Sequence, residues 1–198
     1  MDVALLPTLL GIAMGLGLAA ACGFRVFVPL LVAGLSARFG QLPLATGLSW
    51  VSSTPALVLL GSATLFEIAA YYVPWLDHAL DVLATPAAIV AGILTSAAVM
   101  VTVPPPLNWV VAVVGGGGAA GLIQGASVVF RLKSTALTGG AANPVLATAE
   151  LVGAVGTAAL AILLPIAGLV AILVLLVASF RATGRILFGR PRAAGQPR

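Results

Sequence analysis

Apolar stretches of about 20 residues recur along this chain, and no other feature limits its fold so strongly. The stretches 5–22, 84–103 and 109–130 contain no Asp, Glu, Lys or Arg. Charged residues make up 7% of the chain, against about 25% in soluble domains, and the mean hydropathy is +1.20. A helix of about 20 residues crosses the hydrocarbon core of a bilayer. The sequence therefore predicts an all-α integral membrane protein.

We expect about six transmembrane helices in a single transmembrane domain covering 1–198. Two segments interrupt the apolar pattern: 24–35 is too short to span, and 131–143 is polar. We interpret both as broken or re-entrant segments. The predicted spans are 5–22, 54–74, 84–103, 109–130, 144–165 and 166 to about 181.

The two halves of the chain, about 5–103 and 108–182, share an order of features. In each half a glycine-rich span leads through an arginine (Arg25, Arg131) into an irregular segment. A proline-bounded span with one glutamate (Glu67, Glu150) and an uncharged span follow. Three spans per half would place the halves in opposite orientations, which predicts the inverted 3+3 repeat found in many transporters. Chance similarity between short Gly/Ala-rich helices is the alternative.

Basic residues gather at the C-terminal end. Arg181 precedes a basic tail, 183–198, which carries Arg185, Arg190, Arg192 and Arg198. The positive-inside rule favours a cytoplasmic C-terminus, and six spans would place the N-terminus on the same side. The tail has no aromatic residue after Phe188, so nucleic-acid binding is not expected. The run 5–22 lacks the basic start of a signal peptide and is interpreted as a retained helix.

Glu67 and Glu150 are the candidate functional residues, because each is the only charge in its span. An ionised carboxylate at membrane depth costs several kcal/mol, so it usually faces a partner, a cavity or an ion. Tyr71 follows Glu67 by one helical turn and shares its face. Arg25 either reaches the interface or turns inward to pair with a glutamate or hold an anion. A protonated, hydrogen-bonded glutamate without an ionic role is the simpler alternative.

The second irregular segment is rich in hydroxyl groups, and Asn143 before Pro144 resembles an N-cap. It either lines a pore or is an ordinary loop. Helix breaks are expected at Pro29 and within the glycine run. The residues predicted to line the site here are Ser134, Thr135, Thr138 and Asn143, and the predicted kink residues are Pro29, Gly115, Gly116, Gly117 and Gly118.

Small residues recur every four positions and predict close helix packing within the chain or between copies in a homo-oligomer. They are Gly11, Gly15, Ala19 and Gly23, and Gly117, Gly121 and Gly125. Asp77, His78 and Asp81 are weak metal-ligand candidates, and a hydrated turn is favoured there. No catalytic or phosphate-binding motif is present, so neither enzyme activity nor a cofactor is expected.

Three segments together resemble a family of bacterial inner-membrane proteins catalogued as domain of unknown function 4126. They are 23–31, 67–81 with 84–88, and 133–144 with Glu150. The resemblance covers about residues 10 to 180 and implies a multi-pass fold in the bacterial inner membrane, but no activity.

The sequence thus predicts a small transporter or channel that moves an ion or small charged solute through a site at the repeat interface, with proton or cation coupling as one option. The alternative is a non-transporting membrane scaffold, in which Glu67–Arg25 and Glu150–Arg131 would be internal salt bridges. The lipid bilayer is the expected surrounding in both cases.

Overall fold

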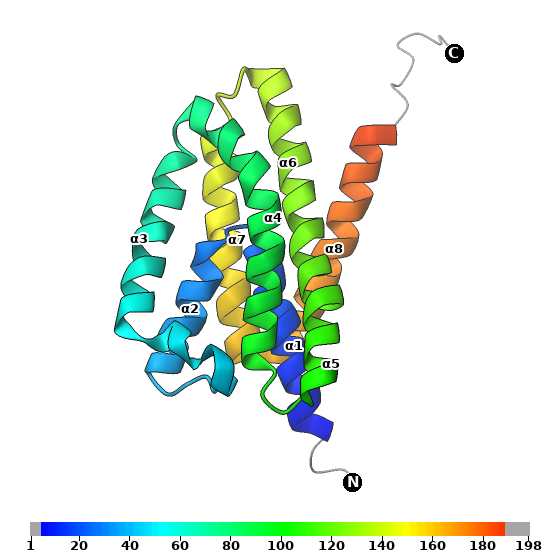
Figure 1. Ribbon diagram of the computed structural model, residues 1–198. Helices are drawn as coiled ribbons and strands as arrows, with labels where there is room; N and C mark the ends of the chain where they lie inside the picture. Colours follow the sequence, from blue (N-terminus) through cyan, green and yellow to red (C-terminus); the bar gives the residue numbers. More distant parts are fainter. Residues whose placement is uncertain (1–4, 189–198) are drawn as a thin grey trace, which may run out of the picture.

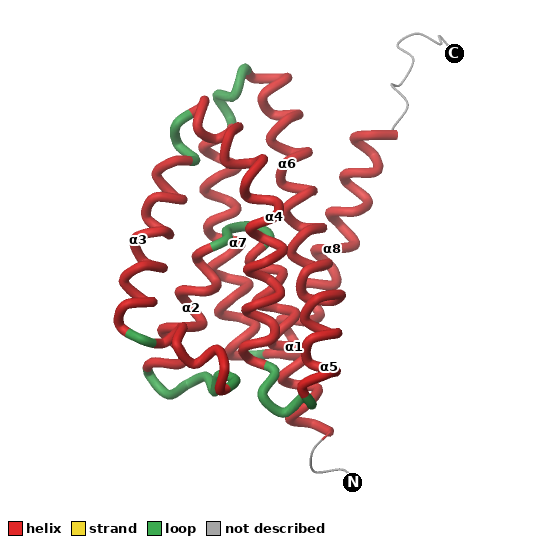
Figure 2. Tube along the Cα trace, in the orientation of Figure 1, coloured by secondary structure: helices red, strands yellow, loops and turns green. Residues whose placement is uncertain are grey.

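The computed structural model describes residues 5–188, apart from the side chains of 74–81, 179, 182, 183 and 185–188. Within this part the chain forms only helices and turns (Figures 1 and 2). The elements are α1 (Leu5–Cys22), α2 (Phe27–Arg38), η1 (Thr46–Ser52), α3 (Thr54–Ala70), α4 (Pro74–Val99), α5 (Pro105–Val111), η2 (Ala112–Gly117), α6 (Gly118–Thr138), α7 (Asn143–Leu163) and α8 (Pro165–Phe188).

The first two helices form a hairpin that turns back inside the bundle. α1 rises from the lower end of the view in Figure 1 to about mid-height. There α2 begins, and it runs back down to the lower end. Gly23 makes the turn possible, because a Cβ there would lie 2.5 Å from the carbonyl oxygen of Ala120. Pro29 lies in the first turn of α2, where proline is tolerated because that N–H has no partner within the helix.

Local sequence signals set most helix boundaries. Proline occupies one of the first two positions of α4, α5 and α7, where its fixed φ suits a helix start. Ser53 caps α3 by accepting a hydrogen bond from the Ala56 amide at 3.4 Å. Gly139 ends α6 with a φ of +64°, a left-handed conformation that glycine adopts without strain.

The number of spans differs from the prediction. Four described helices are long and apolar enough to cross a membrane, namely Leu5–Cys22, Val82–Val99, Pro105–Thr138 and Asn143–Leu163. The pair Thr46–Ser52 and Thr54–Ala70, bent by 63°, would be a fifth. Neither six spans nor an inverted repeat is confirmed, because the Arg25 segment turns back as a hairpin, whereas Arg131 lies inside the continuous helix α6.

The two ends of the described chain lie at opposite ends of the bundle. α1 begins at the lower end and α8 finishes at the upper end in Figure 1. The prediction that both termini lie on one side of the membrane is therefore not confirmed. The hairpin contributes to this arrangement, because α1 starts and α2 finishes at the lower end.

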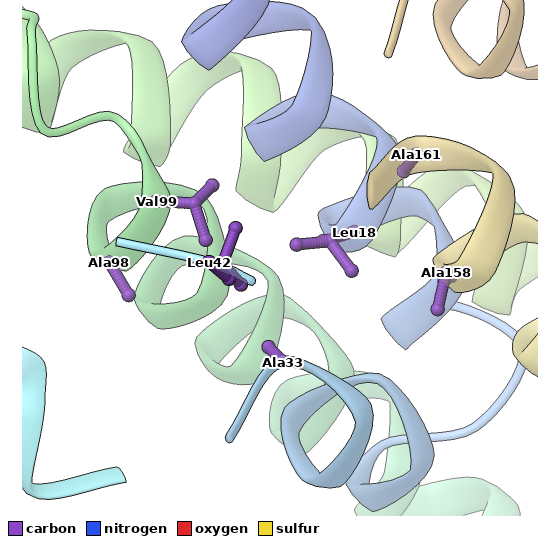
Figure 3. Close-up of a cluster of buried hydrophobic side chains, with 8 residues drawn as sticks. Leu18, Ala33, Leu42, Ala98, Val99, Ala158 and Ala161 are labelled. Carbon is purple, nitrogen blue, oxygen red and sulfur yellow. The ribbon is translucent and has the colours of Figure 1, made fainter. Parts of the chain in front are cut away.

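Small side chains allow α1 to lie at the centre of the bundle, against α4, α6, α7 and α8. Figure 3 shows Leu18 of α1 among Ala33 of α2, Val99 of α4 and Ala158 of α7. A Cβ on Gly17 would come within 2.5 Å of the Ala161 Cβ, so the two backbones approach closely. Gly15 and Gly23 of the predicted stripe likewise pack within the chain, against Ser96 and Ala120, and large apolar side chains such as Phe66 point outward.

Candidate functional site

Four buried charged residues converge inside the bundle. Arg25 comes from the break between α1 and α2, Glu67 from α3, Arg131 from α6 and Glu150 from α7. Their exposed fractions are 2%, 7%, 3% and 9%. Arg25 and Arg131 both contact Glu150, and Glu67 binds the backbone directly after Arg25; we call these four residues the charged cluster.

Glu150 is the most heavily bonded member of the charged cluster. Its Oε1 accepts hydrogen bonds from Ser127 Oγ at 2.7 Å and from Arg131 Nε at 3.1 Å, and its Oε2 pairs with Arg131 Nη2. Arg25 Nη2 lies 3.7 Å from the same Oε2. Glu150 is thus held by a forked arginine pair, the geometry in which carboxylates bind most strongly.

Glu67 has a different kind of partner. Its Oε1 accepts a hydrogen bond from the Val26 amide at 2.7 Å, and its Oε2 accepts one from the Phe27 amide at 3.1 Å. These amides belong to the N-terminal end of α2, where N–H groups have no partner within the helix. Within the described residues no ion pair joins Glu67 to Arg25. A carboxylate from α3 therefore caps a helix that begins in the interior of the bundle.

Arg25 is buried but only partly bonded. Its Nη2 donates to the Ala147 carbonyl oxygen at 2.7 Å, whereas Nε and Nη1 have no acceptor among the described residues. The guanidinium carbon lies 3.9 Å from the centre of the Tyr71 ring, and that of Arg131 lies 4.1 Å from it. Both cations thus contact one aromatic ring, which stabilises them by cation–π interaction.

A cleft of about 510 Å³ reaches one side of the charged cluster. Glu67, Tyr71, Val26 and Phe27 line its inner part. Phe66 and Leu83 also line it and are 77% and 67% exposed, so its mouth opens on the outer surface of the bundle. Glu150 does not line this cleft, so the two glutamates have different surroundings.

The hydroxyl-rich segment forms the last turns of α6 and the connection to α7, at the upper end of the bundle (Figure 1). Asn143 Nδ2 donates to Thr135 Oγ1 at 3.1 Å, and Thr138 Oγ1 donates to the Ser134 carbonyl at 2.8 Å. Asn143 is the first residue of α7 rather than its N-cap, since Ala142 occupies that position. Thr135 and Asn143 thus bond to each other one helical turn from Arg131 and from Ala147, whose carbonyl accepts from Arg25.

The remaining predicted residues lie in other parts of the chain. Gly115, Gly116 and Gly117 lie in η2, a π-helical turn, and Gly118 begins α6. Such wide turns often mark functional sites. Asp77, His78 and Asp81 fall in 74–81, whose side chains lie outside the description. The part of the chain that is described holds no group of three or more His, Cys, Asp or Glu residues placed to bind a metal.

Sequence reasoning missed the partners that complete the charged cluster. Ser127 precedes Arg131 by four residues and shares its helix face, a signal that was available in the sequence. The Ala147 carbonyl and the two amides of α2 carry no such signal, because any residue type supplies a backbone group.

An all-helical bundle of long apolar helices around buried charges defines a multi-pass membrane protein. The family model for a domain of unknown function, DUF4126, matches residues 12–185, and the chain belongs to this family. Neither a curated protein nor a solved structure matches the chain.

Proposed function

We propose that this protein is a small membrane transporter or channel that moves an ion or small charged solute through the charged cluster. The observation that carries the proposal is the convergence of Arg25, Glu67, Arg131 and Glu150 from four separate segments. Buried ion pairs contribute little net stability, and apolar replacements of similar volume are often neutral or stabilising. Charges at membrane depth are therefore better explained by a role in binding or relay.

The helix break supports the same function. The α1–α2 turn, which carries Arg25, lies at about mid-height in Figure 2. Irregular backbone at membrane depth is tolerated only where protein or a cavity covers it, and transporters place such breaks at their binding sites. The cleft that ends at Glu67 leaves space beside this break.

One observation favours the scaffold alternative. The bonds among Glu150, Arg131 and Ser127 leave that pair well satisfied, as a purely structural salt bridge would be. Glu67 at a cleft and the unpaired donors of Arg25 fit this alternative less well, since a structural network would satisfy them internally.

For location, we propose the bacterial inner membrane, as the sequence resemblance implies. The positive-inside rule then places the basic end of α8 in the cytoplasm, and the start of α1 on the opposite face.

The test is solute flux in proteoliposomes containing the full chain. Glu67→Gln and Glu150→Gln should each lower the flux at least tenfold, whereas Ser62→Ala, at an exposed position on α3, should leave it unchanged. Unchanged flux in both glutamate variants would exclude the charged cluster as the site. A stable wild-type protein that moves no ion or solute above empty liposomes would favour the scaffold.

A further inference from the structure

We propose that the cleft beside Glu67 binds an organic cation with an apolar body and a single positive charge, which enters from the bilayer between α3 and α4. The Glu67 carboxylate is its counter-charge. This inference rests on the proposed transport function and names its substrate class.

The walls of the cleft are apolar, so they suit a ligand that carries apolar surface of its own. Apart from Glu67 and Tyr71, every described lining residue is Ala, Val, Leu or Phe. The volume of about 510 Å³ falls within the range of roughly 300–1,000 Å³ typical of small-molecule sites. A small inorganic ion would lose its hydration against such walls without replacement. The exposed side chains of Phe66 and Leu83 form the mouth, so a ligand reaches the cleft from the lipid-facing surface.

Glu67 gives the cleft its charge. Among the described residues that line the cleft it is the only charged one, and it is 7% exposed. Its oxygens accept from the Val26 and Phe27 amides, and no described cationic side chain forms an ion pair with it. A carboxylate accepts about four hydrogen bonds, so about two acceptor positions remain. A carboxylate at membrane depth that lines a cavity without a cationic partner points to a bound cation.

The arginines of the charged cluster have a different counter-charge. Glu150 pairs with Arg131 and lies 3.7 Å from Arg25, and none of these three residues lines the cleft. The Tyr71 ring contacts both guanidinium groups, at 3.9 Å and 4.1 Å, and also lines the cleft. This ring is therefore the part of the cleft wall next to the arginines, and Glu67 is the carboxylate of the cluster that faces a ligand.

Aromatic rings in the cleft favour a cation over an anion. Phe27 lines the inner part and Phe66 lines the mouth, in addition to Tyr71. The face of an aromatic ring attracts positive charge, and such rings are the usual surroundings of bound quaternary ammonium groups. An anion of the same shape would meet the like charge of Glu67 and bind less tightly. The site therefore selects ligands by the sign of their charge.

The test is binding of tetraphenylphosphonium to the purified full chain in detergent, with tetraphenylborate as an anion of nearly the same shape. Equilibrium dialysis gives both affinities, and protein-free micelles correct for partitioning into detergent. The wild type should bind the cation at least about tenfold more tightly than the anion, because Glu67 attracts one and repels the other. Glu67→Gln keeps the size of the side chain and one amide acceptor. It should lower the affinity for the cation at least about tenfold without lowering the affinity for the anion.

A matched pair of variants on α3 locates the ligand. Ala63 lines the cleft, so Ala63→Phe fills part of it and should lower the affinity for tetraphenylphosphonium about tenfold. The control is Ala69→Phe, at an exposed position of the same helix that does not line the cleft, which should leave the affinity unchanged. If Glu67→Gln does not fold, the wild-type preference for the cation and these two variants still decide the question.

The outcomes separate the site from the transport function. Three results would each overturn the cation site: equal wild-type affinities for the two ions, an unchanged cation affinity in Glu67→Gln, or equal effects of Ala63→Phe and Ala69→Phe. Flux of another solute that depends on Glu67, without tetraphenylphosphonium binding, would overturn it too, while keeping the transport function. Binding with the expected selectivity, but without flux in liposomes, would support the site and refute transport.

Discussion

Breaking the Arg131–Glu150 pair should strongly destabilise the bundle. In Arg131→Met, Glu150 loses the hydrogen bond from Nε and the pairing with Nη2, and keeps Ser127 Oγ at 2.7 Å. Removing one partner of a buried pair typically costs about 3–5 kcal/mol, because the other charge stays buried. Arg131 also contacts the Tyr71 ring, and that cation–π contact adds about 0.5–2 kcal/mol.

One contact limits this loss. Arg25 Nη2 lies 3.7 Å from Glu150 Oε2, so Glu150 is not left without a cation. At such a distance two charges attract by about 4 kcal/mol at an effective dielectric constant near 20, which offsets part of the desolvation cost. We therefore expect a loss of about 3 kcal/mol, at the lower end of the range for buried pairs.

A double-mutant cycle separates the pair from its surroundings. Arg131→Met leaves Glu150 with Arg25 alone, and Glu150→Leu leaves both arginines without their carboxylate, so the double variant Arg131→Met/Glu150→Leu should cost less than the sum of the two single losses, with a coupling energy of about 2 kcal/mol. Reversible unfolding in mixed micelles, followed by far-UV circular dichroism, gives the free energies. A loss below about 1 kcal/mol in Arg131→Met, or additive single losses, would refute a dry, tightly paired site.

Three other predictions concern packing and hydrogen bonding. Gly23→Ala should cost about 1–3 kcal/mol, because its Cβ would lie 2.5 Å from the Ala120 oxygen. Gly125→Ala, with nothing within 4 Å, should be neutral or stabilising, and equal unfolding temperatures for the two variants would contradict the close contact. Ser127→Ala should cost about 1.5–3 kcal/mol in the same unfolding assay, as expected for a bond to a charged group, unless water takes its place. Tyr71→Leu removes the ring contacted by both guanidinium groups. It should lower stability more than Tyr72→Leu, because Tyr72 is 46% exposed. The opposite order would argue against cation–π stabilisation.

The helical membrane architecture follows from sequence because long apolar runs leave the backbone few alternatives. Local rules also located the start of α7 beside Pro144, but the predicted spans began α4 at 84 instead of Pro74 and ended α6 at 130 instead of Thr138. The number of transmembrane spans could not be predicted from the sequence in the same way. The run 5–22 has the length of a span, but the chain turns back after it.

The reversal of the chain after α1 depends on contacts between residues that are far apart in the sequence. Gly23 packs against Ala120, and the α2 amides bind Glu67, about 40 residues later. Sequence patterns report periodicity and local caps, so they carry no information about which distant helix lies beside the turn. The same limit explains why charge matching suggested Glu67–Arg25, whereas Glu67 binds backbone and Arg25 binds the Ala147 carbonyl and approaches Glu150.

The two glutamates differ in how firmly they are held, and this difference indicates where the protein can move. Glu150 is fixed by a forked arginine and a serine, a set of bonds worth several kcal/mol to break. Glu67 holds α2 through two amide bonds, and helix caps contribute about 0.5–2 kcal/mol. The interactions that hold α2 at Glu67 are therefore the smaller of the two sets, so the α2 end of the hairpin should open before α6 and α7 separate.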